Sequence, residues 1–497
     1  MAVVKLNSQI GSLKDAVLFR TQAYVGGRWV DADRGGAITV TNPVDGATLG
    51  TVPDLGRAEV RRAIDAANAA WPAWRATLAK DRARLLRKWY ELMIEHQHDL
   101  AVLMTLEQGK SLGESKGEIA YAASFVEWFA EEAKRVYGDT IPQHMANRRI
   151  LVTKEPIGVC AAITPWNFPS AMITRKCAPA LAAGCTTVVK PASQTPYSAL
   201  ALAELAHRAG IPAGVFNVVT GSATEIGAEL TSNPVVRKLS FTGSTEIGAK
   251  LMAQCAPTVK KLSMELGGNA PFIVFDDADL DAAVTGAMVS KYRNSGQTCV
   301  CANRLLVQDG IYDEFAKRFG KAVQQQLKVG NGMEEGVTQG PLINMAAVEK
   351  VEQHIRDAVG KGAQIAVGGR RHALGGTFFE PTVLTGVTPQ MQVARDETFG
   401  PVAPLFRFRT EEEAVRMAND TEFGLAAYFY TRDLGRTWRV AEALEYGMVA
   451  INTGILSTEV APFGGMKQSG FGREGSKYGM EEYLQVKYWC IGEVEKK

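Results

Sequence analysis

From Gly158 onward the chain alternates short apolar runs with longer amphipathic stretches, and this alternation restricts the possible folds more than any other feature. The runs at 158–164 and 186–190 are typical of buried strands, and a helical pattern over 169–183 separates them. Further strands are predicted at 215–219, 235–241 and 259–266, with helices at 198–209, 225–230 and 246–253. Strands that alternate with helices form βαβ units, so we predict an α/β fold with a doubly wound parallel sheet.

A second series of the same kind starts at the apolar run 271–275 and continues to about residue 452, which predicts a second doubly wound sheet. Apolar side chains at three- and four-residue steps predict helices before the first sheet, at 60–74, 85–93 and 113–136. The segments 149–153 and 483–489 are predicted as apolar strands. Such strands need partners, within the chain or in another subunit, because an unpaired apolar edge promotes association.

Length and composition exclude several classes of protein. The 497 residues suffice for two or three domains, and 46% hydrophobic with 22% charged residues is typical of a globular protein. With a net charge of +2 and no dense basic block, nucleic acid is not an expected partner. No apolar run reaches membrane-spanning length, and residues 1–20 lack the pattern of a secretory leader. The seven cysteines lack disulfide spacing, which predicts the cytoplasm, and the six histidines give no metal signature.

The segment 293–304 places a cysteine, Cys299, between a small polar run and a return to apolar residues. This position suits a thiol at the mouth of a cleft, although a lone intracellular cysteine is more often buried and inert. Chemistry with sulfur requires the thiolate, so groups that act on Cys299 must come from other parts of the chain.

Five polar stretches follow the predicted strands or lie in turns, and each has an ordinary structural alternative. After the strand ending at 241, Gly243 allows close backbone approach and Ser244 begins a helix whose N–H groups favour a phosphate; a capped helix is the alternative. Glu265 ends an apolar strand before a Gly-Gly turn, where a surface carboxylate is the alternative. The other three stretches are Pro165–Trp166–Asn167–Phe168–Pro169, Lys190–Pro191–Ala192–Ser193 and Glu397–Thr398–Phe399–Gly400–Pro401. No Gly-x-Gly-x-x-Gly fingerprint follows a strand.

Taken together, the order and spacing of these stretches and of Cys299 resemble the aldehyde dehydrogenase superfamily over nearly the whole chain. The Glu-Leu-Gly-Gly element at Glu265 lies 34 residues before the cysteine, as it does in that family. The resemblance implies a cofactor-binding domain at 1–137 and 158–265, a catalytic domain at 266–475, and a small β oligomerisation arm at 138–157 and 476–497.

The same resemblance implies roles for individual residues. Cys299 would attack the aldehyde carbon, Asn167 and the Cys299 backbone N–H would stabilise the oxyanion, and Glu265 would activate water to hydrolyse the thioester. The cofactor site would be lined by Trp166, Lys190, Ser193, Gly243, Ser244, Leu266, Glu397 and Phe399.

Three features are similar to the succinate-semialdehyde dehydrogenases of that family: Arg175, Arg293 and Ser457 match the positions that hold the far carboxylate of the substrate. Two guanidinium groups and a hydroxyl suit a carboxylate. Glutarate semialdehyde stays open, because one methylene discriminates by only about 1–3 kcal/mol. A CoA-acylating member, a catalytically idle member and a cysteine hydrolase are weaker alternatives, since Cys299, Glu265 and Asn167 are all present and no histidine lies near Cys299 in the sequence.

Three further expectations follow. Many NAD-preferring members carry a glutamate where this chain has Ser193, so we expect NADP to be preferred, with NAD still possible. The Cys-x-Cys pair resembles redox-switched members, so Cys301 is a candidate partner for a reversible disulfide with Cys299. The family likeness of the strands at 149–153 and 483–489 predicts a homotetramer in preference to a homodimer.

Overall fold

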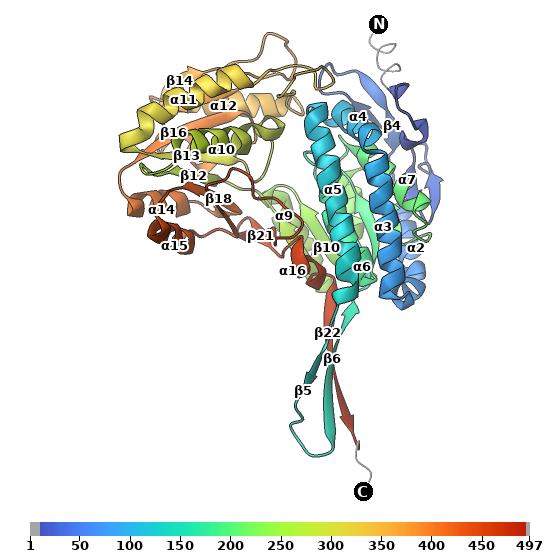
Figure 1. Cartoon of the computed structure of the whole chain (residues 1–497). Coiled ribbons are helices and arrows are strands. Elements are labelled where there is room, and N and C mark those ends of the chain that lie inside the picture. Colours follow the sequence, from blue (N-terminus) through green and yellow to red (C-terminus); the bar gives the residue numbers. More distant parts are fainter. Residues whose placement is uncertain (1–9, 494–497) are drawn as a thin grey trace.

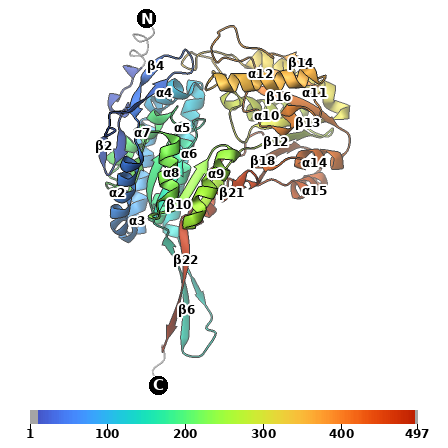
Figure 2. The same cartoon turned by 180° about the vertical axis from the view of Figure 1, so that it is seen from behind.

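The structure, a computed structural model, describes residues 10–493 as two α/β bodies with a projecting β arm (Figures 1 and 2). The outermost ends of the predicted domains, residues 1–9 and 494–497, lie outside the described residues. The predicted fold class is confirmed, because each body contains one large sheet whose central strands are parallel.

The first sheet has eight strands in the order β2-β1-β9-β8-β7-β10-β11-β21. Its strands are β1 (Ala23–Val25), β2 (Arg28–Val30), β7 (Val159–Ile163), β8 (Thr186–Lys190), β9 (Phe216–Val218), β10 (Val236–Thr242), β11 (Lys261–Glu265) and β21 (Gly470–Phe471). The parallel part of the sheet begins with β7. The chain then adds β8 and β9 on one side of β7 and returns to its other side for β10 and β11. The strand order therefore reverses between β7 and β10, which is where open α/β sheets bind their ligands.

Alternating side chains of this sheet enter two separate cores. Val159 and Ala161 of β7 pack with the helices on one face, and Cys160 and Ala162 pack with those on the other. The helices of the first face are α2 (Arg57–Ala76), α8 (Ala223–Ser232) and α9 (Thr245–Cys255). The helices of the second are α3 (Ala79–Glu95), α4 (Gln97–Gln108), α5 (Leu112–Glu132), α6 (Ala171–Ala183) and α7 (Pro196–Arg208). Apolar side chains on both faces explain the continuous apolar runs in the sequence.

Helix α4 is absent from the sequence-based prediction. All of its residues from Asp99 to Gln108 are buried, so the helix lacks the polar stripe that makes an amphipathic pattern visible. The helix therefore shows no clear period, and tertiary packing decides its structure.

The second body has a seven-stranded sheet in the order β14-β15-β16-β13-β12-β18-β19. Its strands are β12 (Ala270–Val274), β13 (Ala302–Gln308), β14 (Gln364–Val367), β15 (Thr382–Thr385), β16 (Val402–Phe408), β18 (Ala426–Tyr430) and β19 (Met448–Ile451). Its helices are α10 (Leu280–Tyr292), α11 (Tyr312–Gln326), α12 (Met345–Gly360), α13 (Gln392–Arg395), α14 (Glu411–Asn419) and α15 (Leu434–Ala443). They cover both faces of the sheet, α10 and α11 on one and α12, α14 and α15 on the other.

The arm is a three-stranded antiparallel sheet of β5 (Asp139–Ile141), β6 (Arg148–Pro156) and β22 (Leu484–Gly492). Strand β22 pairs with β6 over its whole length, with Trp489 opposite Leu151, so the two predicted apolar strands pair with each other. Short helix α16 (Ser476–Glu481) precedes β22, and the small pairs β3 (Ala37–Thr41) with β4 (Thr48–Pro53) and β17 (Phe423–Gly424) with β20 (Met466–Lys467) complete the strands. Within residues 10–493, no helix is both long and apolar enough to cross a membrane.

Candidate active site

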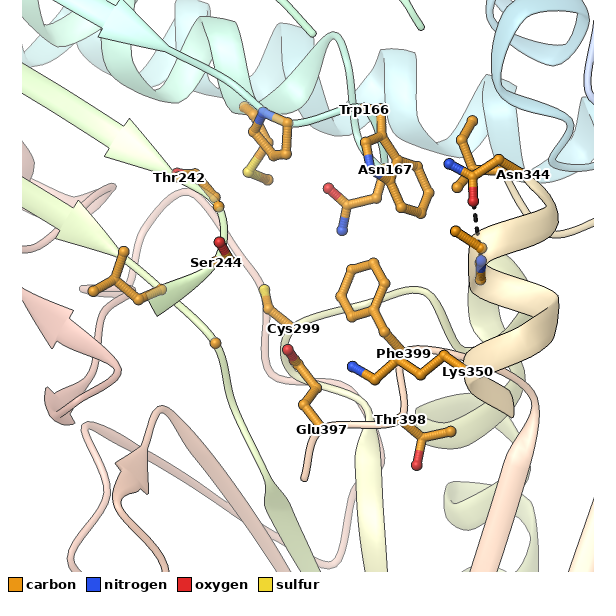
Figure 3. A pocket seen from close by; sticks show the side chains of 18 residues that line it. Trp166, Asn167, Thr242, Ser244, Cys299, Asn344, Lys350, Glu397, Thr398 and Phe399 are labelled. Atoms are coloured by element: carbon orange, nitrogen blue, oxygen red, sulfur yellow. Dashed lines mark hydrogen bonds between the residues drawn. The ribbon is translucent and has the colours of Figure 1, made fainter. Parts of the chain in front are cut away.

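A cavity of about 400 Å³ lies between the two bodies, where the first sheet reverses its strand order (Figure 3). From the first body it receives the turns that follow β7, β10 and β11, which carry Asn167, Ser244 and Leu266. From the second body it receives the segments that precede β13 and β16, which carry Cys299 and Glu397. The carboxyl ends of one sheet thus face the amino ends of another.

Cys299 opens onto this cavity from a tight turn at the end of α10. Asn294 and Ser295 both have left-handed backbone, with φ of 51° and 57°, which turns the chain sharply before the cysteine. A side chain at Gly268 would place its Cβ 2.5 Å from the Cys299 carbonyl oxygen, so only glycine fits beside this turn. The second glycine of the Gly-Gly pair is therefore required so that the Cys299 backbone can pack against it.

Burial raises the pKa of the Cys299 thiol to about 12, and the nearby Glu397 carboxyl adds to the effect while the Arg175 charge opposes it. Because the thiolate is the reactive form, the resting thiol is protonated and must lose its proton before it can attack a carbon atom.

The Asn167 side chain points into the same space as the Cys299 sulfur (Figure 3). Its Nδ2 donates to the Gln297 carbonyl at 3.0 Å, which leaves the second amide hydrogen free for another acceptor. A donor beside a nucleophile is the arrangement that stabilises an oxyanion.

Glu265 ends β11, 3% exposed, and neither oxygen of its carboxyl has a hydrogen-bond partner within the described chain. Burial, together with the charge of Glu474, holds the pKa of Glu265 well above its usual range. A buried carboxyl without partners is costly to maintain, so it marks a functional position rather than a surface strand end.

A buried cluster of charges lies behind Glu265. Glu474 forms an ion pair with Arg175, whose Nε lies 2.5 Å from Glu474 Oε2, and a second ion pair with Lys176. The Arg175 guanidinium also lies 3.9 Å from the centre of the Phe463 ring, and its Nη2 has no hydrogen-bond partner among the described residues. Arg175 is therefore fixed by Glu474 and retains one free donor.

A second cavity of about 300 Å³ contains two of the three residues predicted to bind the carboxylate, Arg293 and Ser457. Tyr121 of α5 also lines it, and its buried hydroxyl has no hydrogen-bond partner among the described residues. The charges of Arg175 and Arg293 both favour the ionised form of Tyr121, although burial raises its pKa. Lys110, Glu114 and Glu118 line the same cavity. Lys110 and Glu118 pair with each other and Glu114 accepts from the Asn294 N–H, so Arg293 and the Tyr121 hydroxyl are the groups that suit an anion.

Sequence reasoning missed Tyr121, Lys110, Asn294 and Glu474. A signal for Tyr121 was present: with Glu114 and Glu118 it forms a polar stripe at helical spacing on a predicted helix. The other three carry no local signal, because their partners are distant in the sequence.

The residues predicted to bind the nucleotide cofactor divide into two groups. Trp166, Gly243, Ser244, Leu266, Glu397 and Phe399 line the large cavity. Lys190 and Ser193 lie outside it, at the end of β8 and just beyond.

These residues fit a nicotinamide nucleotide. Ser244 is the N-cap of α9, so free N–H groups of that helix are available to a phosphate. Among the described residues, Lys190 Nζ donates one hydrogen bond, to the adjacent Pro191 carbonyl, and burial lowers the Lys190 pKa to about 8. Burial of a charged amine is costly, and a single hydrogen bond offsets little of this cost. The amine is therefore suited to donate to an acceptor on a ligand.

Cys301 does not line either cavity. Its Sγ lies 3.3 Å from the Gly296 carbonyl and 3.7 Å from Lys291 Nζ, and burial raises the pKa of its thiol. In this conformation the two cysteines face different surroundings.

Comparisons with known proteins agree with this geometry. The sequence model of the aldehyde dehydrogenase family matches residues 29–489. A glutarate-semialdehyde dehydrogenase of Pseudomonas aeruginosa is 70% identical, covering 97% of this chain and 100% of its own. The NADP(+) succinate-semialdehyde dehydrogenase GabD of Escherichia coli is 68% identical, covering 97% and 99%. The crystal structure of a succinate-semialdehyde dehydrogenase from Burkholderia pseudomallei has a TM-score of 0.96 at 67% identity, covering 97% of this chain and 100% of its own.

Proposed function

Since the chain belongs to the aldehyde dehydrogenase family and is an NAD(P)-dependent aldehyde dehydrogenase, we propose that it oxidises succinate semialdehyde to succinate with NADP. One observation carries this proposal: Asn167 lines the cavity that holds Cys299, and the next residue, Phe168, lines the cavity that contains Arg293, Ser457 and Tyr121. An aldehyde at the sulfur would then have its far carboxylate beside a guanidinium and two hydroxyls, which suit an anion.

The proposed chemistry uses Cys299, Asn167 and Glu265. The Cys299 thiolate adds to the aldehyde carbon, and the free amide hydrogen of Asn167 together with the Cys299 backbone N–H stabilises the oxyanion. Nicotinamide, when bound, accepts the hydride that leaves this carbon. A thioester remains on Cys299, and Glu265 takes a proton from the water that hydrolyses it. Because Glu265 is retained, hydrolysis is favoured over transfer to CoA.

The NADP preference is supported by Ser193, which lies just beyond Lys190 at the end of β8. A 2′-phosphate carries nearly two negative charges, so a glutamate at this position would repel it, whereas a hydroxyl can donate to it.

Glutarate semialdehyde is the second candidate, favoured by the 70% identity to the Pseudomonas aeruginosa enzyme. The two substrates differ by one methylene, which discriminates by about 1–3 kcal/mol.

We also propose a homotetramer, in preference to a homodimer, that assembles through the arm at 138–157 and 476–497 in the cytoplasm. The apolar, exposed surface of β22 supports assembly, and all seven cysteines being free thiols supports a reducing compartment. The cofactor-binding domain is proposed at 1–137 and 158–265 and the catalytic domain at 266–475, with β21 reaching back to pair with β11.

The test is an initial-rate comparison of succinate semialdehyde, glutarate semialdehyde and an uncharged aldehyde of similar length, with NADP and with NAD. We expect the highest kcat/KM for succinate semialdehyde with NADP. Arg293→Met should lower kcat/KM for both charged aldehydes by about ten-fold or more, since a hydrogen bond to a charged group contributes about 1.5–3 kcal/mol. The uncharged aldehyde serves as the matched control, and an equal loss for all three substrates would reject the carboxylate site.

A further inference from the structure

The position of Asn167 depends on its main chain more than on its side chain. The side chain makes one hydrogen bond, to Gln297, and its Oδ1 has no partner among the described residues. Its backbone carbonyl, by contrast, accepts two hydrogen bonds, from Lys110 Nζ at 2.7 Å and from Asn294 Nδ2 at 3.0 Å. The turn that carries the Asn167 amide is therefore fixed by hydrogen bonds to its backbone.

Lys110 makes the first of these contacts from the turn between α4 and α5. The side chain is 2% exposed, and its ammonium forms an ion pair with the equally buried Glu118. The other oxygen of Glu118 accepts from the backbone N–H groups of Ser170 and Ala171, where α6 begins. The Lys110–Glu118 pair thus binds the turn at two places. Lys110 binds the Asn167 carbonyl, and Glu118 binds the start of the helix that follows.

Asn294 makes the second contact from the left-handed turn before Cys299. Besides Asn167, its Nδ2 reaches the Gln297 carbonyl at 3.3 Å, and its Oδ1 accepts from Gln108 Nε2 at 2.9 Å. Gln108 in turn accepts from the backbone N–H of Lys110 at 2.9 Å. One continuous buried network therefore joins Lys110, the Asn167 turn and the nucleophile turn.

Phe168, directly after Asn167, connects this network to the second cavity. Lys110 Nζ lies 4.0 Å from the centre of its ring, and the Arg293 guanidinium carbon lies 5.2 Å from the same centre. Cations within about 6 Å of a ring centre are attracted to its face, so both charges contribute to the position of the ring.

We propose that Lys110 and Asn294 are positioning residues that fix the Asn167 amide where the oxyanion forms beside Cys299. Neither residue lines the cavity that holds Cys299, but both line the second cavity. The test must therefore separate an effect through Asn167 from a direct effect on the substrate carboxylate, and a double-mutant cycle with Asn167 does so. A stabilising donor must lie within about 3 Å of the developing charge, and a displacement of about 1 Å can cost about 10²-fold in rate. The inference deepens the proposed function, because it assigns a support to the oxyanion donor of that reaction.

The experiment is a double-mutant cycle measured in single turnovers, with the rate of cofactor reduction as the readout. Asn167→Ala should slow reduction by about 10²- to 10³-fold, as expected for removal of one oxyanion donor. Lys110→Met, which keeps the length of the side chain but loses its donors, should slow it by about ten- to a hundred-fold. If Lys110 acts through Asn167, the double variant is no slower than Asn167→Ala alone.

Two further variants separate positioning from general destabilisation. Asn294→Gly keeps the left-handed backbone and removes the donor to Asn167, so it should also be silent in the Asn167→Ala background. Lys238→Met removes another fully buried lysine, whose partners Ser263 and Glu482 line neither cavity, and should leave the single-turnover rate unchanged. If Lys110→Met does not fold, Asn294→Gly carries the test by itself.

The outcomes are distinct. Losses for Lys110→Met and Asn167→Ala that multiply, or a Lys110→Met rate equal to wild type, would overturn the proposal. Failure of the proposed function would appear earlier, as a wild-type protein that does not oxidise the semialdehyde. In that case the same cycle is run with whichever aldehyde the wild type oxidises, and it still tests the network.

Discussion

At the scale of single residues, burial raises the pKa of both groups that the proposed mechanism uses, the Cys299 thiol and the Glu265 carboxyl. Each of them acts in its ionised form. In the proposed mechanism the same burial would exclude water and so strengthen the hydrogen bond from Asn167 to the oxyanion. Reactivity is therefore linked to pH and to the order in which the two groups act.

The roles of Cys299 and Glu265 are separable by substitution. Cys299→Ala should abolish turnover, because the carbon atom has no nucleophile. Glu265→Gln should leave a burst of reduced cofactor followed by a steady state slowed by about 10²-fold or more, because general-base catalysis contributes about 10²–10⁴-fold. Stopped-flow absorbance measures both phases. Full turnover by Cys299→Ala would show that the nucleophile is wrong.

The pH dependence follows from the sign of the shifts. A raised pKa means that the ionised fraction of each group at a given pH is smaller than usual and grows as the pH rises toward that pKa. The burst rate should therefore increase between about pH 7 and pH 9, by up to about ten-fold per unit, as Cys299 ionises. In Glu265→Gln the slow phase should lose the pH dependence that ionisation of Glu265 causes. A wild-type burst rate that does not change over this range would contradict the expectation.

Ser193→Glu tests the cofactor preference. The added carboxylate should repel the 2′-phosphate and lower kcat/KM for NADP far more than for NAD, by about ten-fold or more if the charges lie within about 6 Å. Ser193→Gln has a side chain of nearly the same size without the charge, so it is the matched control. A wild type that uses NAD equally well, or a ratio that the substitution leaves unchanged, would show that Ser193 does not select the cofactor.

At the scale of elements, the turn from Arg293 to Gly296 determines what Cys299 and Cys301 can do. The turn directs Cys299 to the cavity and Cys301 to Lys291 and the Gly296 carbonyl. A Cys301 N–H bond to the Thr298 carbonyl at 3.0 Å closes the turn between the two cysteines. A Cys299–Cys301 disulfide therefore requires the turn from Thr298 to Cys301 to rearrange. The ring that such a disulfide closes is small, so the bond is strained and readily reduced.

Peroxide should inactivate the enzyme through this disulfide, and dithiothreitol should restore the activity. Peptide mass analysis should show the loss of two hydrogens from the peptide that contains both cysteines. Cys301→Ala should instead be oxidised irreversibly at Cys299, since no second thiol is close by. Reversible inactivation without that mass loss would exclude the bridge.

At the scale of the whole molecule, the arm extends away from both bodies (Figure 1). Val486 is 72% exposed and Tyr488 is 64% exposed, and both belong to β22, at the edge of the arm sheet. Exposed apolar edges of this kind are a liability unless another chain covers them.

Light scattering at micromolar concentration should therefore give a mass several times the 53.7 kDa of one chain, with four copies expected. Val486→Lys combined with Tyr488→Lys should lower this mass, because charges on an edge strand oppose pairing. Leu374→Lys, at a site 56% exposed and remote in sequence from the arm strands, is the matched control and should leave the mass unchanged. A wild-type mass near that of one chain would rule out the assembly.

The sequence by itself determined the local elements and the family. Strand β8 spans the residues that its apolar run predicts, and the order and spacing of the motifs around Asn167, Glu265 and Cys299 identified the aldehyde dehydrogenase family, because periodicity and motif spacing are local properties of a chain. Only the tertiary structure decided how those groups are supported. Helix α4 is buried on all sides and shows no amphipathic period. The contacts of Lys110 and Asn294 with Asn167, and of Glu474 with Arg175, join residues dozens to hundreds of positions apart. Such contacts depend on how the two sheets pack against each other, and packing leaves no local trace in the order of the amino acids.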